Sequence, residues 1–337
     1  DSFNTAIGYQ TGLNLTTGTQ NVLIGGLSGD AITTGANNVA MGTSSLGTCT
    51  TGTYNVALGD SALFATTTAS NNTAVGGGAL TANTTGTSNI AVGYLALTTN
   101  TTAENNVAVG RQALAINTTG GDNVAIGRNA LYANTTASNN TAVGHTALTA
   151  NTTGASNTAI GQGALDANTT ANNNTAVGGD ALGINTTGAG NVAVGLNALY
   201  ANTTASNNTA VGLSALTANT TGTNNTAVGI SAGVAITTGG YNIVMGDFAG
   251  EKLTTGNSNI LIGRAAGAHN VYLATGARNV IIGALADATD ADVSDANVIG
   301  YDVGGGGGYT TLGNAASDIR AAHGNITWAT VSDERYK

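Results

Sequence analysis

The sequence has no proline, one cysteine, few aromatic residues and very little charge. Only 7% of its 337 residues are charged and 4% are aromatic, whereas soluble domains carry about 25% charged residues. Coiled coils and long helical bundles need charged flanking positions, so these classes are excluded. The lack of proline excludes collagen, and a formal charge of −9 leaves no basic surface for nucleic acid. Cys49 stands alone, so an intrachain disulfide is excluded as well.

Glycine, by contrast, is abundant and recurs on a fixed grid. A glycine closes an Asn-x-Ala-Val-Gly-like stretch every 17 residues from Gly8 to Gly263, and the series resumes after one step of 20 at Gly283 and ends at Gly300. An asparagine stands four residues before the glycine in the first sixteen repeats, and a Thr-Thr pair follows it from Thr16–Thr17 to Thr254–Thr255. Such regularity indicates stacked identical coils, whereas a globular enzyme needs an active site that breaks the symmetry.

The repeat length predicts an all-β fold, a parallel β-solenoid of about 18 coils. Each unit divides into a short extended run, a second extended run of the Ala-Leu-x-Ala type, and a polar Asn-Thr-Thr-Gly loop. Seventeen residues are too few for a helical hairpin repeat. They suit one coil of a solenoid in which each coil pairs with the next at about 4.8 Å.

Stacking places each repeated residue over its own kind, which gives the columns distinct expected roles. The asparagines form a ladder of bonded amides, the glycines form tight corners with positive φ, and the threonines continue the ladder on the outside. The columns are represented by Asn72, Asn89, Asn106, Asn123 and Asn140, by Gly76, Gly93, Gly110, Gly127 and Gly144, and by Thr84 and Thr85.

The extended run is small or apolar on both faces, as in Thr141-Ala142-Val143. A strand that is apolar on both faces is buried on both. One face can fill the narrow interior of the coil, and the other needs a partner surface. We therefore expect a homo-oligomer, with three chains around one axis as the natural arrangement for a fibre.

The unit at Asn140–Leu148, Asn-Thr-Ala-Val-Gly-x-x-Ala-Leu, resembles the head repeat of trimeric autotransporter adhesins of the YadA type. Similar repeats occur in phage tail fibres. The resemblance covers residues 1 to about 300 and implies a left-handed parallel β-roll of three chains. The repeat of that family is shorter, so the Asn-Thr-Thr loop is an extension in this chain.

A second resemblance lies at the C-terminus, in Ser332-Asp333-Glu334-Arg335-Tyr336-Lys337. These residues look like the opening of the endosialidase-type intramolecular chaperone of phage tail spikes and fibres. The resemblance implies self-cleavage between Ser332 and Asp333, with Ser332 and Lys337 as the catalytic dyad. The chaperone body is not in this sequence, so the chain itself is not expected to be an enzyme. The expected domains are a repeat shaft over 1–300, a Gly-rich neck with a short β segment over 301–331, and the chaperone motif over 332–337.

Few other residues suggest a site, and no cofactor is expected. Asp287, Asp290, Asp292 and Asp295 form the densest charge and could hold Ca²⁺, although a solvated cap over the end of the coils is the favoured interpretation. His145, His269 and His323 lie in different repeat columns, without visible partners. Gly304–Gly308 indicates a flexible neck. Nine Asn-Thr-Thr sequons, from Asn83 to Asn219, are formal N-glycosylation sites.

These features predict the structural shaft of a trimeric virion fibre, a phage tail fibre that serves as a stiff spacer and can contact the host receptor. Its partners would be two further copies of the chain and a host surface glycan or protein, with no nucleic acid and no membrane insertion. The alternatives are the head of a bacterial surface adhesin, located on the cell surface, and an ice-binding β-solenoid that uses its threonine columns.

Overall fold

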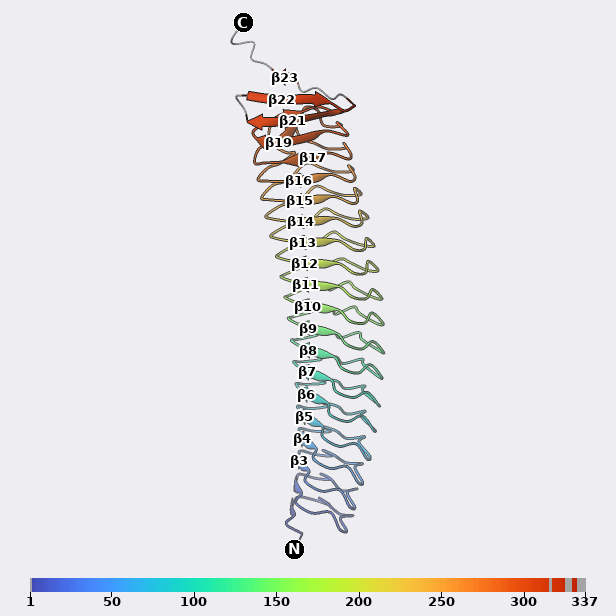
Figure 1. Ribbon diagram of the computed structural model, residues 1–337. Helices are drawn as coiled ribbons and strands as arrows, with labels where there is room; N and C mark the ends of the chain where they lie inside the picture. Colours follow the sequence, from blue (N-terminus) through green and yellow to red (C-terminus); the bar gives the residue numbers. More distant parts are fainter. Residues whose placement is uncertain (1, 315–316, 325–328, 332–337) are drawn as a thin grey trace. The chain divides into compact units, whose positions relative to one another are not determined.

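The structure is a computed structural model that describes residues 2–314, 317–324 and 329–331. The chain divides into two compact units, Asp1–Asn173 and Asn174–Lys337. Within each unit, successive coils contribute short strands that pair in parallel with the strand of the next coil (Figure 1). The predicted all-β parallel β-solenoid with a 17-residue repeat is confirmed in both units.

The first unit contains ten three-residue strands, one in each coil. Equivalent residues lie opposite each other, so that Ala142 pairs with Ala125 on one side and with Ala159 on the other. The strands are β1 (Thr5–Ile7), β2 (Val22–Ile24), β3 (Val39–Met41), β4 (Val56–Leu58), β5 (Thr73–Val75), β6 (Ile90–Val92), β7 (Val107–Val109), β8 (Val124–Ile126), β9 (Thr141–Val143) and β10 (Thr158–Ile160).

The second unit repeats this pattern and then departs from it. Its regular strands are β11 (Thr175–Val177), β12 (Val192–Val194), β13 (Thr209–Val211), β14 (Thr226–Val228), β15 (Ile243–Met245), β16 (Ile260–Ile262) and β17 (Val280–Ile282). The remaining strands are β18 (Asp287–Ala288), β19 (Asn297–Tyr301), β20 (Gly304–Gly305), β21 (Tyr309–Asn314), β22 (Ser317–Ala322) and β23 (Ala329–Val331). Parallel pairing continues past residue 300, from β19 to β21, and β22 and β23 then add in the antiparallel sense.

Gly304–Gly308 does not begin as the predicted flexible neck, because its first two residues form β20 and pair with β18. Gly305 is buried, and a Cβ built on it would lie 2.4 Å from Cγ2 of Val298. Glycine is required there by close packing. The run therefore belongs to the folded end of the second unit.

The core of each coil is thin and is made mostly of small residues. In the coil around β8, Ala125, Ala130 and Leu131 are fully buried, whereas Val124 and Ile126 point outward. The leucine column supplies the largest buried side chains in most coils, and burying each leucine contributes roughly 1.5–3 kcal/mol.

The Ala-Leu-x-Ala segment is not the second strand that the sequence predicted, because it forms a tight turn. Leu131 and Leu148 have φ of 52° and 55°, in the left-handed region. This conformation costs a non-glycine residue about 1 kcal/mol or more, and complete burial of the leucine offsets the cost. Propensity favoured an extended run here, but only a turn brings both alanine and leucine into so narrow an interior.

The asparagine that precedes each strand forms a buried column, which we call the strand-side ladder. The side-chain oxygen of Asn89 accepts hydrogen bonds from the backbone nitrogen of Asn106 at 3.0 Å and from its Nδ2 at 3.2 Å. The same Nδ2 also donates to the carbonyl of Gly120 at 3.0 Å. Asn72, Asn89, Asn106, Asn123 and Asn140 all belong to this column and are fully buried.

A second buried column, the turn-side ladder, runs through the segment expected to be a polar loop. Nδ2 of Asn117 donates to Oδ1 of Asn100 at 3.1 Å and to the carbonyl of Gly120 at 2.9 Å. In this column of the first unit, the buried hydroxyl of Thr66 has no hydrogen-bond partner within the described chain. In the corresponding column of the second unit, Oδ1 of Asn219 likewise has none within the described residues.

The corner glycines leave no room for a side chain. Gly76, Gly93, Gly110, Gly127 and Gly144 have φ between 130° and 139°. A Cβ on Gly76 would lie 2.6 Å from the carbonyl oxygen of Gly93 in the next coil. Gly77, the next residue along the chain, has an ordinary φ. A Cβ added to it would lie 3.7 Å from its nearest neighbour, the ring of Tyr94.

We predict that Gly76→Ala lowers the free energy of unfolding by at least about 2 kcal/mol, because it adds a backbone clash to an unfavourable φ. The matched control Gly77→Ala should change it by less than about 0.5 kcal/mol. Urea titrations followed by circular dichroism measure both. Equal effects at the two positions would contradict the corner role of Gly76.

We further predict opposite effects at two positions of the turn-side ladder. Asn117→Leu removes the donor to Oδ1 of Asn100 and should cost about 1–3 kcal/mol, because that buried acceptor is left unpaired, whereas the carbonyl of Gly120 keeps its bond from Nδ2 of Asn106. Thr66→Val replaces an unpaired hydroxyl with a methyl group, and should be neutral or stabilising by up to about 1 kcal/mol. Thermal unfolding of the two variants tests this, and a clear loss of stability in Thr66→Val would show that the hydroxyl is paired.

Candidate functional site

The outward side of the strands forms an apolar surface in both units, which we call the lateral face. It consists of the first and third residues of each strand, and from β1 to β17 none of these residues is charged. In the first unit, Ile126 and Ile160 are each 40% exposed. In the second unit, the residues that follow three successive corner glycines extend this apolar surface: Leu196, Leu213 and Ile230 are 51%, 45% and 44% exposed.

An apolar surface that is repeated at every coil is uncommon on a soluble monomer, and it marks an interaction site. Its chemistry is simple, because it offers aliphatic groups and some threonine hydroxyls at one fixed spacing. It can bury area against a matching surface, but it has no groups suited to catalysis. The lateral face is therefore our first candidate functional site.

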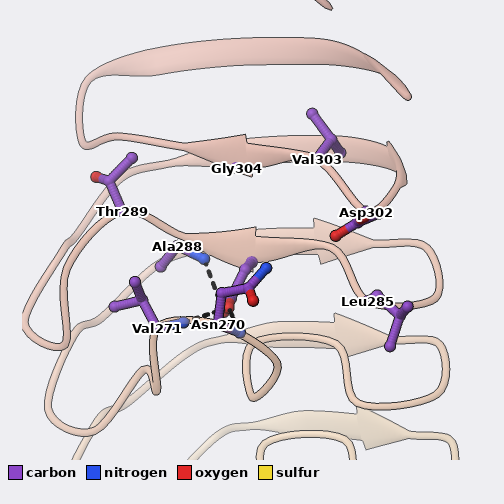
Figure 2. Close-up of a pocket in the computed structure, with 9 residues that line it drawn as sticks. Asn270, Val271, Leu285, Ala288, Thr289, Asp302, Val303 and Gly304 are labelled. Atoms are coloured by element: carbon purple, nitrogen blue, oxygen red, sulfur yellow. Dashed lines mark hydrogen bonds between the residues drawn. The ribbon is translucent and has the colours of Figure 1, made fainter. Parts of the chain in front are cut away.

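The second unit also contains a pocket of about 280 Å³ beside the long coil between Gly263 and Gly283. Val271, Leu285 and Val303 supply apolar walls, and Asn270 and Asp302 supply polar ones. Figure 2 shows Val271 and Thr289 on one side of the pocket, with Leu285 and Asp302 on the other. Of the long coil, Asn270 and Val271 line the pocket.

Asp287 holds the extra loop in place. Its Oδ2 accepts hydrogen bonds from the backbone nitrogens of Asn270 and Val271, both at 2.6 Å, and its Oδ1 accepts one from the nitrogen of Ala288 at 3.1 Å. The side chain is buried, with 3% exposure. Burial raises the pKa of this carboxyl above its ordinary value, and the backbone donors oppose part of that rise.

The four aspartates considered for calcium have separate environments. Asp287 is bound to backbone amides, Asp290 and Asp292 are exposed, and Asp295 forms a two-pronged ion pair with Arg278 at 2.7 and 2.8 Å. The Arg278 guanidinium lowers the pKa of Asp295. Within residues 2–314, 317–324 and 329–331, no group of three His, Cys, Asp or Glu side chains is placed to hold a metal ion.

The three histidines lie apart. His145 contacts Arg128 in the first unit, with Nε2 2.5 Å from Nη2. In the second unit, His269 lies 3.9 Å from Asp302 beside the pocket, and His323 contacts Asn297 at 3.1 Å. Cys49 is fully buried, and burial raises the pKa of its thiol to about 11, which disfavours the reactive thiolate.

The Thr-Thr pairs lie in a bend, where the two hydroxyls have different environments. The Thr84 hydroxyl is half-buried and donates to the carbonyl of Thr101 at 3.0 Å, whereas Thr85 is exposed. The asparagines of all nine Asn-Thr-Thr sequons are fully buried and so cannot carry a glycan in the folded chain: Asn83, Asn100, Asn117, Asn134, Asn151, Asn168, Asn185, Asn202 and Asn219. The turn-side ladder, which sequence reasoning read as a polar loop, accounts for this burial.

The predicted dyad, Ser332 and Lys337, lies outside the described residues. No family model, no curated protein and no solved structure matches this chain. The described residues include no helix long and apolar enough to cross a membrane. The lateral face and the pocket beside Asp287 are therefore proposed as candidate sites from their geometry alone.

We predict that the unfolding stability of the wild type rises relative to that of Asp287→Asn as the pH falls from 7 toward about 4, the ordinary pKa of aspartate. The folded carboxyl has the raised pKa, so the folded state binds the proton more tightly than the unfolded state does, and acidification favours folding. Urea titrations of both proteins across this pH range measure the difference. A relative loss of wild-type stability on acidification would contradict the raised pKa.

Proposed function

We propose that this chain is the structural shaft of a homotrimeric fibre, a virion appendage of the phage tail fibre kind that acts as a stiff spacer. The observation that carries the proposal is the lateral face. It is apolar at every coil of both units, and its side chains stay partly exposed in the single chain.

A second copy of the chain is the partner that fits this face best. The coils repeat at about 4.8 Å, and a surface with the same spacing can place a side chain against every coil. An ordinary globular partner would meet only a few of them. A cyclic arrangement covers the lateral face of each copy without leaving one copy uncovered.

The internal hydrogen bonding supports a mechanical role. Within each unit, successive coils are joined by strand pairing and by the strand-side ladder, as at Asn106 and Asn123 in the first unit. Bending such a stack requires many of these bonds to lengthen together. The polar columns are repeated from coil to coil, so the coils offer no unique set of groups for catalysis.

Host contact is part of the same proposal, and the pocket beside Asp287 is the feature that supports it. The pocket breaks the repeat and joins apolar walls to the polar groups of Asn270 and Asp302, a combination that suits part of a surface glycan or protein. The adhesin alternative has the same coils and differs in its flanking segments: a chaperone domain in the full-length gene supports the fibre, and a membrane-anchor domain supports the adhesin. Thermal hysteresis would support the ice-binding alternative.

We predict a native mass close to three times the chain mass of 32.7 kDa, measured by light scattering on a size-exclusion column. The double variant Ile126→Lys/Ile160→Lys places charges on the lateral face and should run as a monomer. Thr136→Lys/Thr170→Lys changes exposed threonines outside that face and should remain trimeric. A monomeric wild type would contradict the proposal.

A further inference from the structure

Charge in the first unit is concentrated around two adjacent strands. Glu104 and Asp122 precede β7 and β8, and Arg111 and Arg128 follow them. Between residues 2 and 173 the only other Asp, Glu, Lys or Arg residues are Asp30, Asp60 and Asp166. Each of these two coils therefore has an acid at one edge of the lateral face and a base at the other.

The four side chains do not neutralise one another within the chain. All four are exposed, and in the part of the chain that the structure describes none of them takes part in an ion pair. Glu104 and Arg111 lie seven positions apart, with six residues between them, and an extended chain of that length spans at most about 23 Å. Strand β7 lies between Glu104 and Arg111, and β8 lies between Asp122 and Arg128, so the acid and the base of each coil are on opposite sides of a strand.

Like charges are instead stacked at each edge. The backbone nitrogen of Asp122 donates to the carbonyl of Glu104 at 3.1 Å, and that of Asn129, next to Arg128, donates to the carbonyl of Arg111 at 3.1 Å. The two acids are therefore neighbours, as are the two arginines. Unit charges about 5 Å apart repel each other, and the other coils of this unit avoid such stacks. A partner with opposite charge would remove the repulsion.

We propose that Glu104 and Asp122 of one copy pair with Arg111 and Arg128 of the next copy, forming an intersubunit charge clamp. This inference rests on the proposed homotrimer. Copies related by an axis along the stack have equivalent coils at the same height, and the acidic edge of one lateral face then meets the basic edge of its neighbour. The partner is a second copy of this chain, in the same orientation.

The clamp fixes the register and orientation of the copies, which the apolar contacts do not. The lateral face is nearly the same at every coil, so a copy shifted by several coils buries almost the same apolar area. Such a shift separates the two charged coils from their partners. An antiparallel copy with these two coils at the same height would place acid against acid and base against base, and like-charge contacts at an interface are unfavourable. The clamp therefore selects parallel copies in register.

Charge reversal tests the clamp. Arg111→Glu/Arg128→Glu and Glu104→Arg/Asp122→Arg each create a contact between like charges, and each should raise the protomer concentration at half-assembly by at least about tenfold at low salt. The combined quadruple variant restores opposite charges at every contact and should assemble within about threefold of the wild type. Asp60→Arg is the matched control, because the residue at the opposite edge of its coil is Tyr54; it should assemble like the wild type.

The outcomes separate this inference from the proposed function. A monomeric wild type overturns both. A trimeric wild type whose two double variants assemble equally well overturns the clamp alone. If the quadruple variant fails to recover assembly, the charges do not pair with each other, and the clamp is overturned. In a fourth outcome, only Arg111→Glu/Arg128→Glu differs from the wild type, and it differs by no longer binding an added acidic polymer such as polyglutamate. The arginines then bind an external anion, and the clamp is overturned.

Discussion

The structure depends on one constraint: the buried amide groups of each coil must be satisfied by the coil next to it. A coil of small residues has too little apolar volume to be stable alone. If it stood by itself, its two buried asparagines would lose the bonds that they form with the next coil: Asn106 and Asn117 would keep the carbonyl of Gly120 but lose Asn89 and Asn100. Buried amides without partners are costly, so each coil forms only against another. Cooperativity in each unit follows from this dependence.

The same constraint explains the composition. Because each residue lies over its equivalent at about 4.8 Å, a charged column would repel itself along the stack. Neutral residues that can bond or pack with their own kind meet the requirement, and these are asparagine, threonine, alanine and glycine. A charged column is tolerated where it covers only two successive coils, as at Arg111 and Arg128. Charge is also tolerated where the repeat is interrupted, as at Arg278 and Asp295.

Much of this fold could be predicted from the sequence, because periodicity carries the information. The period, the parallel stacking and the strand-side asparagines all follow from residue spacing. The turn-side ladder was missed because Asn-Thr-Thr-Gly has the composition of an exposed loop. A signal was present in the same column, where Ile32, Cys49, Ile236 and Leu253 replace asparagine. A position that accepts both asparagine and aliphatic residues is a buried one.

The pocket and the Asp287 anchor could not be predicted, because they depend on the path of a single irregular coil. Spacing identified the three-residue insertion but not the direction in which it would fold. A carboxylate that accepts backbone hydrogen bonds from its own neighbourhood looks, in sequence, the same as a metal ligand. The distinction is made by which donors the loop presents to it.

The corner glycines have a consequence for how such a chain can change. The position after each corner is at least partly exposed, and it carries Tyr94, Arg111, Arg128 and His145 in successive coils of the first unit, then Leu196, Leu213 and Ile230 in the second. The internal columns leave no such freedom. The residue at this position can therefore be substituted in one coil at a time, by an aromatic, basic or aliphatic residue, while the buried columns of the coil stay the same. A repeat that copies itself strictly inside thus supports a nonrepeating pattern outside.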